Sequence, residues 1–200
     1  MKPPSAFIAT HRRWRHRALF TTTLLFAALA RAQIVADPKA PPDHRPTLLK
    51  TPNGKPLVNI QSPNAAGISH NLFDQFNVPS GGVVLNNSAT PTPTQIGGWV
   101  PANPWLATGS ARLILNEVTG QNPSLIHGPL EVAGQRADVI MANPAGISIN
   151  GGTFINANRV TLTTGTPVFN GDQLTAMRVQ RGTVRVEGAG LDARQTSHTA

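Results

Sequence analysis

The feature that most constrains the fold is a series of short β-branched and aliphatic runs that begins at residue 57. Each run is four to seven residues long and ends at Gly, Asn or Pro. After residue 32, no window repeats apolar residues at i, i+3, i+4 and i+7 over about eleven positions, so helical and α/β folds are disfavoured. The runs predict an all-β domain with strands at 57–60, 83–87, 112–118, 130–134, 138–143, 147–150, 153–157, 159–165 and 183–188.

The breaks between these runs bear on two all-β architectures. A sandwich or barrel would show two-residue hairpin turns such as Asn-Gly between alternating strands. The breaks here are mostly Gly-x-Asn-Pro, Asn-Pro-x-Gly and Asn-Gly-Gly segments. These suit the corners of a solenoid, where Gly and Asn adopt bent or left-handed backbone at low cost. Corner positions are expected for Asn86, Asn87, Asn116, Asn150, Asn156 and Asn158. The residues alone leave the solenoid and the sandwich open.

Residues 1–32 have the order of a secretory signal peptide. A basic stretch is followed by an apolar run, Ala18 to Ala30, and then by Ala30-Arg31-Ala32. We expect cleavage between Ala32 and Gln33. The apolar run is short of the roughly 20 residues that a membrane-spanning helix needs, so the segment predicts export and not a retained anchor.

Charge and cysteine content exclude several classes of protein. The chain carries a formal charge of +8, but residues 33–200 hold 11 cations and 9 acids. A nucleic-acid partner is not expected, because phosphate binding needs a dense basic stripe in the mature domain. The absence of cysteine excludes disulfides and thiolate metal sites. The histidines are too scattered to predict a metal site, and no cofactor is expected.

Sequence motifs for catalysis are lacking. There is no G-x-S-x-G, H-E-x-x-H, calcium loop or phosphate-binding loop. Ser69, His70 and Asp74 could suggest a hydrolase, but a histidine in a Phe-rich segment is more typical of a packed cap residue. The central acids, Glu117, Glu131 and Asp138, are expected on solvated strand faces. The chain is therefore not expected to be an enzyme.

Longer stretches of the sequence resemble the amino-terminal secretion domain of filamentous haemagglutinins, the large exoproteins of Gram-negative two-partner secretion. The matching stretches keep their order and lie at 62–78, 84–88, 94–106, 114–134 and 138–165. The resemblance implies a right-handed parallel β-helix with an amino-terminal cap and extra-helical strands. The chain is then expected to consist of a signal peptide (1–32), an extended, Pro-rich and charged arm or cap (33–56) with a short strand at 33–35, and a secretion domain (57–200). In the family this domain continues into more coils, so truncation at the carboxy end is expected.

Two turn motifs are associated with secretion in that family. The first, usually Asn-Pro-Asn-Leu, corresponds to Asn103, Pro104, Trp105 and Leu106. The second, usually Asn-Pro-Asn-Gly-Ile, corresponds to Asn143, Pro144, Ala145, Gly146 and Ile147. Each has lost its second Asn. The remaining Asn-Pro pair predicts a type I turn, in which Pro fixes φ and the Asn side chain caps the turn. The alternative is that both motifs are only turns between strands.

The resemblance also implies partners and a destination. These are the Sec machinery, the periplasmic polypeptide-transport domains of an outer-membrane transporter, and host-cell surface glycans or receptors. The protein would be a secreted or cell-surface virulence factor of the adhesin or haemolysin type. Two other functions stay open: a polysaccharide-active β-helix enzyme, which would need clustered carboxylates, and a stand-alone glycan-binding module that needs no transporter.

Overall fold

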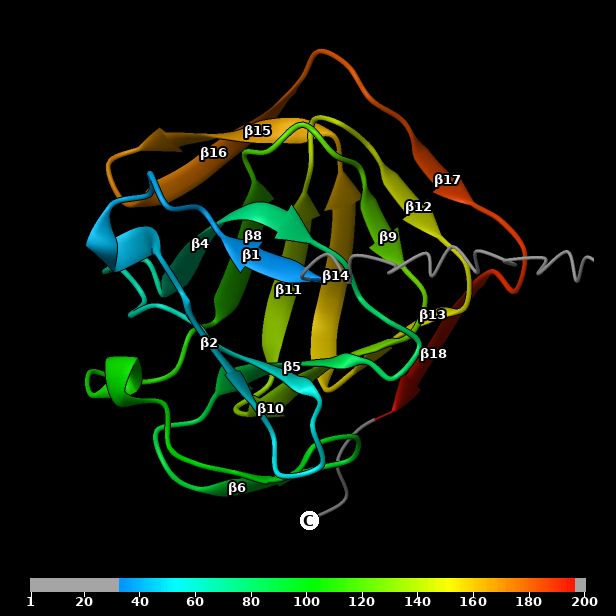
Figure 1. The fold of residues 1–200 in the computed structure, drawn as a ribbon. Helices are drawn as coiled ribbons and strands as arrows, with labels where there is room; N and C mark the ends of the chain where they lie inside the picture. Colours follow the sequence, from blue (N-terminus) through cyan, green and yellow to red (C-terminus); the bar gives the residue numbers. More distant parts are fainter. Residues whose placement is uncertain (1–32, 197–200) are drawn as a thin grey trace, which may run out of the picture. The chain divides into compact units, whose positions relative to one another are not determined.

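The computed structural model describes residues 33–196, which form a parallel β-helix (Figure 1). The first coil contains β3 (Pro56–Asn59) and β4 (Ile68–Phe76). The second contains β5 (Val83–Asn87), β8 (Leu113–Val118) and β9 (Ser124–Ile126). The third contains β10 (Pro129–Gly134), β11 (Ala137–Ala142) and β12 (Ile147–Ile149). The fourth contains β13 (Gly152–Ile155), β14 (Ala157–Thr163) and β17 (Val184–Val186), and β18 (Leu191–Thr196) follows it.

Strands from successive coils stack into three sheets. Sheet A has the order β4-β8-β11-β14, sheet B the order β3-β5-β10-β13-β18, and sheet C the order β9-β12-β17. All of these pairs are parallel; Leu85, for example, lies opposite Val58 of the previous coil and Val132 of the next. Parallel pairing one coil away decides between the two architectures in favour of the solenoid. Each of the nine predicted runs coincides with a strand.

The amino-terminal segment caps the first coil. β1 (Ile34–Ala36) runs antiparallel to β4, and β2 (Thr47–Lys50) runs antiparallel to β3. A short 3-10 helix, η1 (Pro42–His44), lies between them. Ile34 is buried in the main core. Residues 33–56 are therefore a paired cap, and the short strand expected at 33–35 begins one residue later.

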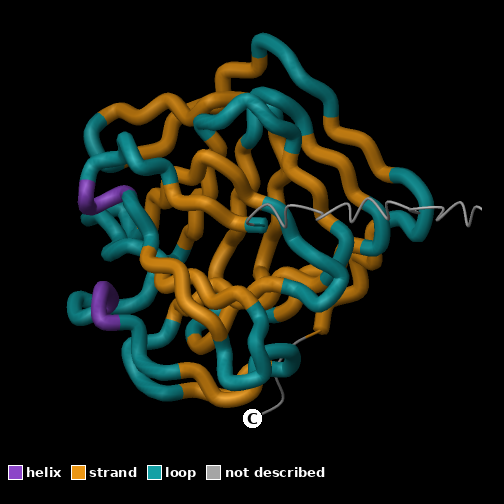
Figure 2. Tube along the Cα trace, viewed as in Figure 1, coloured by secondary structure: helices purple, strands orange, loops and turns teal. Residues whose placement is uncertain are grey.

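Two hairpins project from the coils and fold back over them. β6 (Thr92–Thr94) and β7 (Gly98–Val100) follow β5, and β15 (Gly165–Asn170) and β16 (Gln173–Val179) follow β14. The first hairpin covers sheet B through a cluster that includes Leu57, Val84 and Val100. The second covers sheet A, where Phe169 and Met177 pack against an apolar stripe. Figure 2 shows that strands dominate the described chain. Its helices are the two short 3-10 turns at Pro42–His44 and Pro104–Leu106.

The inside of the coil is apolar with a few polar side chains. Phe73 and Phe76 are fully buried and meet edge to face, with ring centroids 4.8 Å apart. Asn156 lies at a corner with φ of 56°, as predicted. The corner position expected for Asn116 is wrong: it lies within β8, opposite Asn71 of the previous coil, and its side chain is fully buried. Its amide donates to Met141 Sδ of the next coil at 3.6 Å.

The predicted signal peptide, including Ala32, lies outside the described residues. Within residues 33–196, no helix is long and apolar enough to cross a membrane.

Candidate functional site

The first Asn-Pro motif forms a capped turn that joins two coils. The backbone N–H of Leu106 donates to the Asn103 carbonyl at 3.2 Å, and the Trp105 N–H donates to Asn103 Oδ1 at 3.1 Å. Pro104 opens the short helix η2 (Pro104–Leu106). The amide of Asn103 donates to the carbonyl oxygens of Ile60 and Asn86 at 2.8 and 2.9 Å. The predicted capping role of Asn103 is confirmed, and the same side chain also links the first and second coils.

The second motif repeats this arrangement at another corner. The Gly146 N–H donates to the Asn143 carbonyl at 3.0 Å, and the Ala145 N–H donates to Asn143 Oδ1 at 2.9 Å. The Asn143 amide donates to the Asn122 carbonyl at 3.0 Å and to Ser124 Oγ at 2.9 Å. The turn continues into β12 at Ile147. Gly146 has φ of 121°, a backbone conformation that residues with a side chain rarely adopt.

Burial divides each motif in the same way. The first and last residues of each are buried: Asn103 and Leu106 in one, Asn143 and Ile147 in the other. Between them, Pro104 and Trp105 are exposed, Pro144 and Ala145 are half-buried, and Gly146 is buried. The motifs lie at different corners, one between sheets B and A and the other between sheets A and C, so the fold does not bring them together. Each motif presents an accessible Pro-x pair on a buried Asn anchor.

Trp105 occupies the position where the related motif usually has Asn. Its side chain is 43% exposed, and its indole Nε1–H donates to Thr47 Oγ1 in the capping strand β2 at 3.1 Å. The substitution therefore keeps the turn and adds a contact between the turn and the amino-terminal cap.

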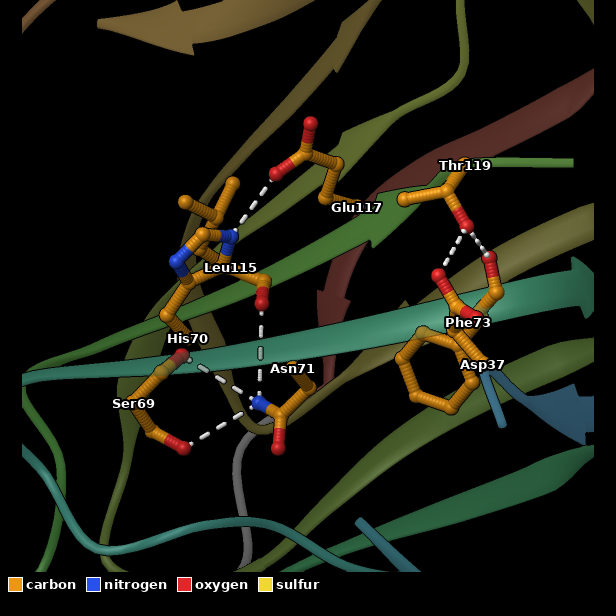
Figure 3. Close-up of polar contacts among 8 residues, drawn as sticks. All are labelled: Asp37, Ser69, His70, Asn71, Phe73, Leu115, Glu117 and Thr119. Carbon is orange, nitrogen blue, oxygen red and sulfur yellow. Dashed lines mark hydrogen bonds and ion pairs between the residues drawn. The ribbon is translucent and has the colours of Figure 1, made fainter. Parts of the chain in front are cut away.

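Ser69 and His70 are not arranged as the nucleophile and base of a hydrolase. Ser69 is fully buried and its hydroxyl donates to the Gln61 carbonyl at 2.7 Å. His70, the next residue on β4, points to the opposite face and bonds Glu117 Oε2 through Nε2 at 2.8 Å (Figure 3). Alternation along the strand thus separates the hydroxyl from the imidazole. The ring of His70 packs between those of His44 and Phe169, at centroid distances of 4.6 and 5.2 Å.

The expectation that Glu131 lies on a solvated face is wrong. It is fully buried on the outer face of β10, beneath the β6–β7 hairpin. Its carboxylate accepts hydrogen bonds from the backbone N–H groups of Gln95 and Ile96 at 2.7 and 2.9 Å. The hairpin that creates this environment was not predicted, so its effect on Glu131 could not be seen in the sequence. Glu117 is only slightly exposed and is paired with His70, whereas Asp138 is half-buried.

Two ionisable groups of the cap have shifted pKa values. Burial lowers the pKa of His44 from its ordinary 6.5, helped by the nearby His70, and against the opposing effect of Asp43 and Glu117. The Thr119 hydroxyl, which donates to Asp37 at 2.7 Å, lowers the pKa of that carboxyl (Figure 3). The Asp37 bond ties the cap to the second coil. Within the described residues, no group of three or more His, Cys, Asp or Glu residues could hold a metal ion.

Comparisons with known proteins agree on one family. The family model described as the TPS secretion domain matches residues 32–200. A solved structure, described as the crystal structure of a filamentous hemagglutinin secretion domain, is 44% identical, has a TM-score of 0.73, and covers 80% of this chain and 52% of that chain. The predicted right-handed parallel β-helix with an amino-terminal cap and extra-helical strands is thereby confirmed.

Curated relatives are much longer proteins. Toxin CdiA of Yersinia pestis is 51% identical over 170 residues, which are 85% of this chain and 5% of that protein. tRNA nuclease CdiA-2 of Burkholderia pseudomallei (strain 1026b) is 43% identical over 180 residues, 89% of this chain and 6% of that protein. The chain thus spans about a twentieth of the length of these relatives.

Proposed function

The chain belongs to the TPS secretion domain family, the export domain of two-partner secretion exoproteins, and we propose that an outer-membrane transporter recognises its β-helix through both Asn-Pro turns. The supporting observation is that Asn103 and Asn143 cap their turns in the same way although each motif has lost its second Asn. The turn geometry that the two motifs share presents the accessible Pro-x pairs that a partner would contact.

The burial pattern suggests separate roles within each motif. Asn103 and Asn143 hold the backbone from inside, whereas Pro104, Trp105, Pro144 and Ala145 face outward. Recognition through the outward residues would make them dispensable for folding and necessary for export. If the motifs were only turns, all of their effects on export would follow their effects on stability.

The wider export route follows from the same proposal. Sec would carry the chain across the inner membrane, with cleavage between Ala32 and Gln33, and the transporter's periplasmic polypeptide-transport domains would receive it. The exoprotein would then reach the cell surface or the medium. An adhesin or haemolysin with host-surface receptors is one candidate for the whole protein. A toxin is the second, because the curated relatives are named as toxins and nucleases.

Secretion in a Gram-negative host tests the proposal. Residues 1–200 would be expressed with and without a two-partner transporter from the same genome, and the protein would be assayed in the medium and the periplasm. We expect release into the medium only with the transporter. Release without it would favour the stand-alone glycan-binding module, and retention in both cases would contradict export by this domain.

A matched pair of tryptophan variants separates recognition from folding. Trp105→Ala removes an exposed side chain within the first motif, whereas Trp99→Ala removes one that is 66% exposed on β7, outside both motifs. We expect Trp105→Ala to reduce transporter-dependent secretion strongly, with only a small fall in melting temperature from the loss of its hydrogen bond to Thr47. Trp99→Ala should secrete normally. Equal secretion by both variants would contradict recognition through Trp105.

A polysaccharide-active enzyme is less well supported. Glu131 is buried under a hairpin on sheet B and Glu117 is bonded to His70 on sheet A, so the two carboxylates do not flank a common sugar-binding surface. The hydrolysis of glycosidic bonds needs two carboxylates that flank the substrate.

A further inference from the structure

We infer that the groove on either side of Pro144 is a binding site for an acidic peptide segment, held by the guanidinium groups of Arg178 and Arg181. This inference rests on the proposed function, because it assigns the segment to the transporter's periplasmic domains. It adds a contact of defined chemistry to the second Asn-Pro turn.

The groove consists of two adjoining hollows that share Pro144 and Arg181. The larger, about 430 Å³, is lined by the end of β8, the residues that follow it, and the end of β16. The smaller, about 250 Å³, reaches Ala145 and Gly182. The accessible half of the second motif, Pro144 and Ala145, therefore lies inside a concave surface and not on a protruding loop.

The hairpin β15–β16 directs the first arginine into this groove. Arg178 lies opposite Thr166 in the antiparallel pair, so both side chains share one face of the hairpin. The neighbouring Met177 packs on sheet A from the other face. Arg178 therefore lies on the face of the hairpin opposite Met177, where it lines the larger hollow, and Arg181 follows where the chain leaves the hairpin.

The charges of the groove favour an anion. Arg178 and Arg181 are both exposed, and within residues 33–196 neither guanidinium group makes a hydrogen bond or an ion pair. Glu117 is the acid in the lining, and its carboxylate is already bonded to His70 at 2.8 Å. Thr164 and Thr166 add hydroxyl groups to the walls, whereas the Thr119 hydroxyl already donates to Asp37. Two free guanidinium groups beside hydroxyl donors suit carboxylates, which arginine binds with paired hydrogen bonds.

A peptide fits better than a polyanion. Residues 33–200 carry 11 cations and 9 acids, so the domain lacks the dense positive charge with which proteins bind nucleic acid or anionic surfaces. The groove instead combines two cations with the apolar surface of Pro144 and Ala145. An extended segment with one or two Asp or Glu residues would use both features.

Binding of the mature chain to the isolated periplasmic domains of its transporter tests the inference. The double variant Arg178→Glu/Arg181→Glu should bind about tenfold more weakly and lose much of its salt dependence, because it replaces attraction with repulsion. Arg178→Lys/Arg181→Lys keeps the charge without the planar fork and should bind with intermediate affinity. The control is Arg159→Glu, an exposed position on β14 that lines neither hollow.

The outcomes distinguish this inference from the proposed function. If the wild type binds and the double charge reversal binds within about twofold of it, the groove is not the site, while transporter recognition stands. Equal weakening by Arg159→Glu would show a general charge effect and overturn the inference. If the wild type does not bind the periplasmic domains at all, both fail. If the double charge reversal removes binding to vesicles containing anionic lipid but leaves binding to the transporter's periplasmic domains unchanged, the groove is a site for a lipid surface and the inference is overturned.

Discussion

The side-chain amide of Asn103 donates to the carbonyl oxygen of Ile60 at 2.8 Å and so holds a turn of the second coil against the end of the first. The same amide reaches the carbonyl of Asn86 at 2.9 Å. The Asn-Pro turn at Asn103 therefore links two coils by hydrogen bonds as well as changing the direction of the chain. Loss of the Asn103 side chain should lower the stability of the fold.

Replacing Asn103 with Ala should lower the free energy of unfolding by about 1–3 kcal/mol, because it leaves two carbonyl oxygens without this donor. Urea denaturation of the mature chain measures the change. Asn122→Ala is the control: Asn122 is exposed and contributes only its carbonyl to the second turn, so about 0.5 kcal/mol or less is expected. If Asn103→Ala lowers the free energy of unfolding no more than Asn122→Ala does, the proposed link between coils is contradicted.

Glu131→Gln should loosen the β6–β7 hairpin. One carboxylate oxygen that accepts a backbone N–H becomes an NH₂ group, which places a donor against a donor. We expect faster hydrogen exchange at the backbone amides of Gln95 and Ile96. The free energy of unfolding should fall by about 1–3 kcal/mol. Asp138→Asn, on the half-buried acid of β11, should leave both amides unchanged. Unaltered exchange in Glu131→Gln would rule out this anchor.

Gly120→Ala should prevent close stacking of the first two coils. A Cβ at this position would lie 1.9 Å from the carbonyl oxygen of Asp74, part of a β4 backbone that cannot move aside. We expect the free energy of unfolding, measured by urea denaturation, to fall by about 3 kcal/mol or more. Gly81→Ala is matched to it, because its Cβ would meet only the flexible end of Lys55. Comparable stability of the two variants would show that the coils adjust.

Thermal stability should fall as the pH is lowered below about 6.5 because of His44. Burial lowers the pKa of His44 in the folded state, so the fold favours the neutral imidazole. Its contribution is present above the unfolded value of 6.5 and is lost as the pH falls through the lower folded value. Melting temperatures between pH 8 and pH 5 measure the effect. The melting temperature of His44→Gln should fall less than that of the wild type between pH 8 and pH 5. If the variant and the wild type show the same pH dependence, groups other than His44 cause the effect.

Sequence reasoning recovered the strands with apolar alternation but not those shaped by distant contacts. It missed β4, because Ser69 and Asn71 interrupt the apolar pattern and yet are buried inside the coil. There, Asn71 Oδ1 accepts the Gln61 N–H at 2.9 Å. Its amide donates to Ser69 Oγ at 3.1 Å (Figure 3). It also missed both hairpins, whose residues are mixed in polarity because each covers a sheet with one face and meets solvent with the other.

What the sequence by itself determined is local: the all-β class, the strands with clear periodicity, and the Asn-Pro turns, since each depends on backbone preferences within a few residues. Only the tertiary structure decided that each strand pairs in parallel with one a coil away, as Leu85 does with Val132. It also decided that Glu131 is buried and that Arg178 and Arg181 flank Pro144. These features depend on contacts between residues more than thirty positions apart in the chain, and no short stretch of sequence encodes which distant surface will cover it.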